Sequence, residues 1–172
     1  HAVSRVLEIG VLGGSSLRMW EEFFPQAAIF GFDIDPGCLA HGGDRRHVVI
    51  GDQASGESLD RLMAFVGTGV DLIIDDGSHV TTTQRFTFDR LFAHLCPGGL
   101  YAIEDLQTSY QAPYGGGPDG FSMVDYLKRL ADQVNLYGGP RSGQEQVDAG
   151  ALVPEVAAVH FHYGLTIVEK RL

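Results

Sequence analysis

The chain alternates short apolar segments with longer amphipathic ones, and this alternation constrains its fold more than any other feature. Segments typical of buried strands cover residues 4–12, 27–35, 47–52, 70–76 and 100–106. The segments between them, such as 15–24 and 55–67, place apolar residues at helical spacing. Strands that alternate with helices of this length predict an α/β fold with a doubly wound, mostly parallel sheet.

The alternation stops in the last third of the chain. Residues 121–135 predict a long helix, and residues 158–172 predict two strands that meet near Tyr163 and Gly164. These strands would add an antiparallel C-terminal hairpin, which brings the expected sheet to seven strands. The chain shows no internal repeat, so we expect residues 1–172 to form a single domain. Residues 107–121 (QTSYQAPYGGGPDGF) are the least regular segment and predict a flexible flap.

Composition argues against several classes of function. The 172 residues carry a formal net charge of −10, whereas nucleic-acid and membrane-surface sites need clustered Lys and Arg. No apolar run approaches the roughly 20 residues that span a bilayer, and no signal-peptide pattern opens the chain. Cys38 and Cys96 lack a metal-binding spacing, so a reducing cytoplasm is the expected location. We expect neither nucleic-acid nor membrane partners.

A glycine-rich turn joins the first predicted strand to the first predicted helix. Gly10, Gly13 and Gly14 would let the backbone approach a ligand closely at the N-terminus of that helix. The spacing is not GxGxxG, which disfavours a dinucleotide. Glu8, just before the glycines, suits a ribose or a cationic part of a ligand. A glycine turn of purely structural value is the alternative.

Acidic residues also end the second and third predicted strands. Asp33 lies about 20 residues after the glycine turn, where doubly wound folds hold ribose hydroxyls. Asp35, before a proline, is more typical of a turn or cap. Asp52 and Gln53 follow the third strand and could reach a base edge, although a helix cap explains Asp52 equally well.

Two pairs of acidic residues close the fourth and fifth predicted strands. They are Asp75 and Asp76 on one strand, and Glu104 and Asp105 on the other. Ligands bind beyond the carboxyl ends of strands in an open parallel sheet, and four carboxylates gathered there repel unless they are protonated or bridged by a cation. Oxygen ligands without cysteines favour Mg²⁺. Either pair alone could be structural, but the two together predict a metal site.

His79 follows Asp76 by three residues, in the loop that leaves the fourth strand. Beside a cation that activates a hydroxyl group, a neutral imidazole is well suited to act as general base. His160 and His162 alternate on a predicted strand and therefore face the same side, where surface exposure or core packing is the expected role.

These motifs together resemble the class I S-adenosylmethionine-dependent methyltransferases. The likeness is greater to the metal-dependent sugar O-methyltransferases of the mycinamicin type and their mycobacterial relatives, and it runs through nearly the whole chain. It is carried by LEIGVLGGSSLRMW, IIDDGSHV, GGLYAIEDLQTSY and VHFHYGLTIVEK. The resemblance implies a Rossmann-like methyltransferase fold and S-adenosylmethionine as cofactor. Members usually carry residues before the first strand that cover the site or build an oligomer, so a homo-oligomer is compatible with it.

The resemblance also implies a role for each matching residue. Mg²⁺ would be held by Asp76, Glu104 and Asp105, with Asp75 as the alternative to Asp76, and His79 would be the catalytic base. Within the cofactor site, Gly10 and Gly13 would shape the methionine end, Asp33 would hold the ribose, and Asp52 and Gln53 would lie near the adenine. The full set of expected cofactor residues is Glu8, Gly10, Gly13, Ser15, Asp33, Asp52, Gln53 and Asp75.

We therefore expect a Mg²⁺-dependent O-methyltransferase that acts on a hydroxyl group of a sugar or glycoside. Tyr110, Tyr114 and Phe121 in the flap would offer aromatic faces to the sugar ring. A catechol-type enzyme is an alternative, because the vicinal oxygens of a small phenol would chelate the same metal. A non-catalytic cofactor-binding protein is another alternative, and the glycine spacing disfavours an NAD-dependent oxidoreductase.

Overall fold

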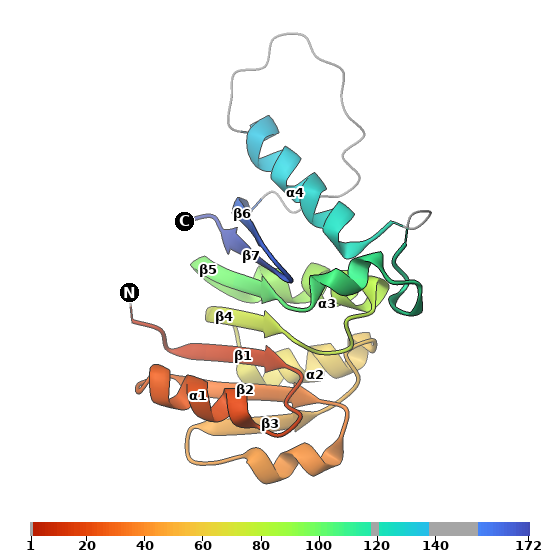
Figure 1. Ribbon diagram of the computed structural model, residues 1–172. Helices are drawn as coiled ribbons and strands as arrows, with labels where there is room; N and C mark the ends of the chain where they lie inside the picture. Colours follow the sequence, from red (N-terminus) through yellow and green to blue (C-terminus); the bar gives the residue numbers. More distant parts are fainter. Residues whose placement is uncertain (1, 118–120, 138–154) are drawn as a thin grey trace.

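A seven-stranded sheet forms the centre of the computed structural model, which describes residues 2–117, 121–137 and 155–172 (Figure 1). The strand order is β3-β2-β1-β4-β5-β7-β6. The strands are β1 (Arg5–Ile9), β2 (Ala28–Asp33), β3 (Arg46–Ile50), β4 (Val70–Asp75), β5 (Leu95–Ile103), β6 (Val156–His162) and β7 (Leu165–Lys170). β1 to β5 pair in parallel, and β7 pairs antiparallel with both β5 and β6. This confirms the predicted doubly wound sheet with its C-terminal hairpin.

Helices cover both faces of the sheet. They are α1 (Ser15–Phe23), α2 (Gly56–Val66), α3 (Thr81–Leu91) and α4 (Met123–Tyr137), with the short 3₁₀ helices η1 (Pro36–His41), η2 (Phe92–His94), η3 (Leu106–Tyr110) and η4 (Ala112–Tyr114). Leu17 of α1 packs in one buried cluster with Val6 and Ile29, on the face where α1 lies in Figure 1. The core residues of α2, α3 and α4 pack on the opposite face.

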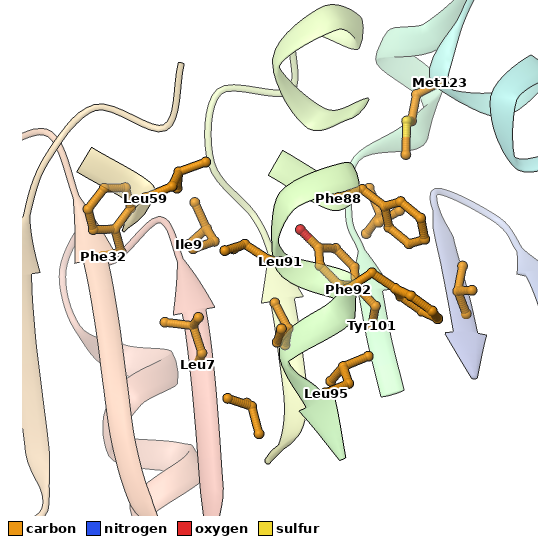
Figure 2. Close-up of a cluster of buried hydrophobic side chains, with 14 of the residues drawn as sticks. Leu7, Ile9, Phe32, Leu59, Phe88, Leu91, Phe92, Leu95, Tyr101 and Met123 are labelled. Carbon is orange, nitrogen blue, oxygen red and sulfur yellow. The ribbon is translucent and has the colours of Figure 1, made fainter. Parts of the chain in front are cut away.

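Aromatic packing fixes α3 against β5. The Phe88 ring lies 4.9 Å, centroid to centroid, from both Phe92 and Tyr101, and all three side chains are fully buried (Figure 2). Buried aromatic pairs contribute about 0.5–1.5 kcal/mol beyond the area they bury. This cluster therefore fixes α3 against β5. The placement of β5 beside β4 brings the two acidic pairs to one edge of the sheet.

β5 begins and ends earlier than the strand predicted over residues 100–106. Pro97, Gly98 and Gly99 were expected to precede the strand, but β5 already begins at Leu95. The register between β4 and β5 shifts here: Val70 pairs with Leu95, whereas Leu72 pairs with Leu100. The extra residues of β5 interrupt the regular pairing, and Gly98 among them adopts a φ of +73°. This irregularity accommodates the turn-forming residues without ending the strand.

Several smaller expectations are confirmed. The helix predicted over residues 55–67 is capped by Ser55, whose side chain accepts a hydrogen bond from the Ser58 backbone N–H. Asp35 caps η1 in the same way through the N–H of Gly37. His160 and His162 lie exposed on β6. Within the described ranges, none of the helices has the length and apolarity that crossing a membrane requires.

Candidate active site

A cavity of about 770 Å³ opens at the carboxyl ends of β1 to β4. This is a typical size for a small-molecule site, and it lies at the switch point of the sheet, where β1 pairs with β4 and the strand order reverses. The predicted cofactor residues that line it are Gly10, Gly13, Ser15, Asp33, Asp52 and Gln53. Asp76, His79 and Asp105 line the same cavity. Glu8, Asp75 and Glu104 do not.

Gly10 and Gly13, two of the glycines of the turn, differ in the space that a side chain would find at each position. Gly10 has a φ of +93°, and a Cβ atom there would overlap the backbone carbonyl oxygen of Asp76. The turn is pinned by hydrogen bonds from Gly10 N to Phe32 O (2.8 Å) and from Asp76 N to Ile9 O (2.9 Å). A Cβ atom on Gly13 would meet nothing within 4 Å. Gly10 therefore allows the chain segments to approach closely, and Gly13 leaves open space for a ligand.

Asp33 holds the glycine turn from the end of β2. Its Oδ2 accepts hydrogen bonds from Val11 N (2.7 Å) and Leu12 N (3.2 Å), and its Oδ1 accepts one from Asp35 N (2.9 Å). Partial burial opposes ionisation, but these three backbone donors together lower the pKa of Asp33. The carboxylate therefore stays charged and retains lone pairs that can accept hydrogen bonds from the hydroxyl groups of a ligand in the cavity.

Gln53 and Asp75 form a buried pair behind the cavity wall. Nε2 of Gln53 donates to Oδ1 of Asp75 at 2.7 Å, and Oε1 of Gln53 accepts from Ser78 N at 3.0 Å. Asp75 has no exposed surface, and burial raises its pKa to about 7. Asp75 therefore orients Gln53, which does face the cavity. Asp52 is not a helix cap, because Ser55 caps α2; its Oδ1 accepts a hydrogen bond from Ala54 N at 2.8 Å in a local turn.

Glu8 lies on the α1 face of β1, opposite the core residues Leu7 and Ile9. It is only 3% exposed, and its Oε2 has no hydrogen-bond partner among the described residues. Burial raises the pKa of Glu8 to about 7; the Ser16 hydroxyl opposes this rise, and the charges of Asp76 and Glu104 add to it. The carboxyl group thus lies behind the glycine turn, at 3% exposure and with an unpaired oxygen.

The candidate metal centre is made by Asp76, His79 and Asp105, whose potential ligand atoms all lie within 4.8 Å of one another. Nε2 of His79 lies 3.6 Å from Oδ2 of Asp105 and 4.0 Å from Oδ1 of Asp76. The side chains of Asp76 and Asp105 are 42% and 52% exposed, so both carboxylates can reach a ligand. Burial raises the pKa of Asp76; His79 opposes the rise and Asp105 adds to it.

Glu104 stands beside this group rather than in it. It is half-buried, and burial together with the charges of Asp76 and Asp105 raises its pKa. Mg²⁺ is commonly held by one or two carboxylates and keeps several waters, and it prefers oxygen to imidazole nitrogen. The donor set fits this ion. Asp76 and Asp105 face the cavity, and Glu104 lies close enough to interact electrostatically with both.

Backbone strain concentrates at the cavity. Leu12, His79 and Asp105 are the non-glycine residues with positive φ in the described part of the chain, and all three line the cavity. Such a conformation costs about 1–3 kcal/mol per residue and is frequent at functional sites. Sequence reasoning missed Leu12 and the apolar wall made with Phe32 and Ile34, although these residues directly flank the glycine turn and Asp33.

The irregular segment 107–121 contains η3 and η4, and residues 118–120 lie outside the described residues. The Tyr114 ring meets the His79 ring edge-on, with centroids 6.5 Å apart. Tyr110 is exposed. Phe121 instead packs against arginines, with its ring centroid 4.2 Å from the Arg129 guanidinium carbon. Of the three flap aromatics, Tyr114 therefore lies beside the candidate metal centre.

Comparison with known proteins identifies relatives over nearly the whole chain, although no protein-family model matches it. The chain is 40% identical over 176 residues to the 8-demethyl-8-alpha-L-rhamnosyl tetracenomycin-C 2′-O-methyltransferase of Streptomyces olivaceus, covering 96% of this chain and 45% of that protein. It is 38% identical over 181 residues to the mycinamicin VI 2″-O-methyltransferase of Micromonospora griseorubida, covering 96% of this chain and 43% of that protein.

Solved structures show the same relationship. The MycE methyltransferase of the mycinamycin biosynthetic pathway, in complex with Mg and SAH, superimposes with a TM-score of 0.87 at 36% identity. That match covers 98% of this chain and 46% of the other. A second structure of MycE, with Mg, SAH and mycinamycin VI, gives a TM-score of 0.85. The chain thus spans less than half the length of the relatives it matches.

Proposed function

This chain is a homologue of the class I S-adenosylmethionine-dependent sugar O-methyltransferases over 96% of its length, and we propose that it carries the same activity. The proposed reaction is transfer of the methyl group of S-adenosylmethionine to a hydroxyl group of a sugar or glycoside, with Mg²⁺ as the second cofactor. The observation that carries the proposal is that one cavity joins the glycine turn and Asp33 to the Asp76, His79 and Asp105 cluster.

The cofactor would occupy the part of the cavity between the glycine turn and Gln53. Gly13 leaves open space there. The Asp33 carboxylate can accept hydrogen bonds from the two ribose hydroxyl groups while it also holds the glycine turn. Gln53 would present its edge to the adenine, since Asp75 and Ser78 fix the orientation of its amide. In its ionised form, the buried Glu8 would place negative potential behind the turn. Such a potential suits the cationic sulfonium and amino groups of the cofactor.

The acceptor would approach from the side of Asp76 and Asp105. Bound Mg²⁺ would lower the pKa of the acceptor hydroxyl group and orient it. Asp76 and Asp105 would hold the ion, with Glu104 beside them. His79 would accept the hydroxyl proton at Nε2, the ring nitrogen that faces the cluster. The site must also hold the hydroxyl oxygen in line with the sulfonium methyl group, so that the carbon–oxygen bond forms as the carbon–sulfur bond breaks and S-adenosylhomocysteine leaves.

Segment 107–121 is proposed as the acceptor-side flap. Tyr114 lies beside His79 and could stack on a sugar ring, and Tyr110 is exposed on the same segment. A glycoside acceptor is supported by the relatives, one of which was solved with mycinamycin VI. A homo-oligomer stays a prediction.

A product assay with labelled S-adenosylmethionine tests the proposal against a panel of sugars, glycosides and catechols, with chelator and with added Mg²⁺. We expect a methylated glycoside whose formation stops in chelator and returns with Mg²⁺. Turnover of catechols alone would favour the catechol-type enzyme. Cofactor binding without cation binding or product would favour a non-catalytic protein, and tighter binding of NAD than of S-adenosylmethionine would reject the methyltransferase.

A further inference from the structure

Two residues of the candidate metal centre share a backbone conformation that is costly for non-glycine residues. His79, in the loop after β4, has a φ of +55°, and Asp105, directly after β5, has a φ of +52°. Asp105 is held on one side by η3, whose Thr108 N–H donates to the Asp105 carbonyl. The placement of Asp105 against His79 depends in addition on contacts that tie one loop to the other.

Thr108 makes that contact. Its Oγ1 lies 2.7 Å from the carbonyl oxygen of Asp105 and 3.3 Å from the carbonyl oxygen of His79. The hydroxyl group has one proton, which the two carbonyl groups share: the shorter contact, to Asp105, is local and common in turns, whereas the longer one, to His79, spans 29 residues and joins the two loops. Thr108 is 6% exposed, so water competes little for its hydroxyl group.

The neighbouring residue strengthens this arrangement. Nε2 of Gln107 donates to Oδ1 of Asp105 at 2.9 Å, which leaves Oδ2 facing His79. The Thr108 N–H also donates to the Asp105 carbonyl at 3.0 Å. The start of η3 thus holds Asp105 through both its backbone and its carboxylate, and only the Thr108 hydroxyl reaches across to His79 in these contacts.

We infer that Thr108 is a positioning residue that holds the Asp105 loop against the His79 loop, places the Asp105 carboxylate beside Asp76, and so determines the affinity of the site for a divalent cation. The inference rests on the proposed function, because it assumes that Asp105 is a ligand. Thr108 does not line the cavity and acts only through the two carbonyl groups. Residues that orient metal ligands in this way commonly affect affinity about 10–100-fold.

The test compares Thr108→Val with Thr108→Ser in the full chain. Valine keeps the branched shape and loses the hydroxyl group, whereas serine keeps the hydroxyl group. The matched control is Thr87→Val, because Thr87 is also buried and its Oγ1 also donates to a carbonyl, that of Thr83 at 2.9 Å. Binding of Mn²⁺, followed by electron paramagnetic resonance, and binding of S-adenosylmethionine, followed by calorimetry, are measured for each variant.

We expect Thr108→Val to bind Mn²⁺ about 10-fold or more weakly while cofactor affinity stays unchanged, and we expect Thr108→Ser and Thr87→Val to behave as wild type. Equal loss of cation and cofactor affinity, or no loss, would overturn the inference. Absence of Mn²⁺ binding to the wild-type chain would instead reject the proposed metal site and the inference with it. If the valine variant does not fold, Thr108→Ser and Thr108→Ala isolate the same hydroxyl group.

Discussion

Nε2 of Gln53 donates a 2.7 Å hydrogen bond to Oδ1 of Asp75, a carboxyl group with no exposed surface. The adjacent Asp76 lies on the other side of the cavity wall, 42% exposed and within the same cluster as Asp105. Two neighbouring aspartates thus face different partners, as successive residues at the end of a strand do. This difference supports Asp76, rather than Asp75, as the ligand.

The Asp76→Asn variant is therefore expected to weaken Mn²⁺ binding by at least about tenfold, which corresponds to about 1.4 kcal/mol. Asp75→Asn should leave Mn²⁺ affinity within about a factor of two of wild type, because the asparagine oxygen can still accept the Gln53 bond. Cofactor affinity should also stay close to that of wild type, because Gln53 keeps its orientation. Calorimetric titration of both ligands into both variants makes the comparison, and the reverse pattern would transfer the ligand role to Asp75.

His79→Asn should bind S-adenosylmethionine as wild type does but lose turnover by about 10²-fold or more, the usual contribution of a general base. Asparagine is chosen because it tolerates the left-handed backbone found at His79, so a loss cannot be assigned to strain. Single-turnover rates measure the effect. His160→Asn on the exposed face of β6 is the matched control. Turnover near the wild-type rate in His79→Asn would remove the imidazole from the mechanism.

Most of the fold follows from local patterns in the sequence. The alternation of apolar and amphipathic segments is enough to predict a parallel sheet, because strands buried on both faces need helices on both faces. The start of β5 was mispredicted because Pro97, Gly98 and Gly99 have the composition of a turn. Their accommodation within β5 depends on the pairing of Val70 with Leu95, and that contact is not encoded locally.

The candidate site was predictable in its residue types and less so in its layout. The ends of β4 and β5 supply both acidic pairs, and their parallel pairing brings these residues to one edge. Which acid faces the cavity depends on side-chain direction, and the burial of Asp75 behind Gln53 follows only from the packed structure. The role of Thr108 has no sequence signal, since the bond between its hydroxyl group and His79 joins segments that are brought together by folding.

Gly10→Ala and Gly13→Ala form a matched pair of substitutions within one turn. Alanine at position 10 would combine a positive φ with overlap of the Asp76 carbonyl, and we expect it to lower the free energy of unfolding by roughly 2–5 kcal/mol. Alanine at position 13 meets no protein atom within 4 Å. It should leave stability unchanged and weaken cofactor binding by intruding on the cavity. Urea denaturation and cofactor titration separate the two effects, and equal stabilities would contradict the close approach at Gly10.

The buried Glu8 makes stability depend on pH in a specific direction. Burial raises its pKa from an ordinary 4.5 to about 7 in the folded chain, so the folded state keeps a proton that the unfolded state releases between these values. The stability that this proton contributes is fully present below pH 4.5 and is lost as the pH rises through 7. At one pKa unit per 1.36 kcal/mol, the loss is of order 3 kcal/mol at most.

Glu8→Gln carries no ionisable group and should therefore be more stable than wild type at pH 8, with the difference shrinking toward pH 5. Urea denaturation of the cofactor-free chain in chelator, at pH 5, 6.5 and 8, measures this difference. Glu57→Gln is the control, because the Glu57 side chain is 82% exposed and lies on the surface of α2. A difference for Glu8→Gln that stays constant from pH 5 to 8 would mean that the Glu8 carboxylate is ionised throughout. Its unpaired Oε2 would then need a partner that holds the charge in the folded chain.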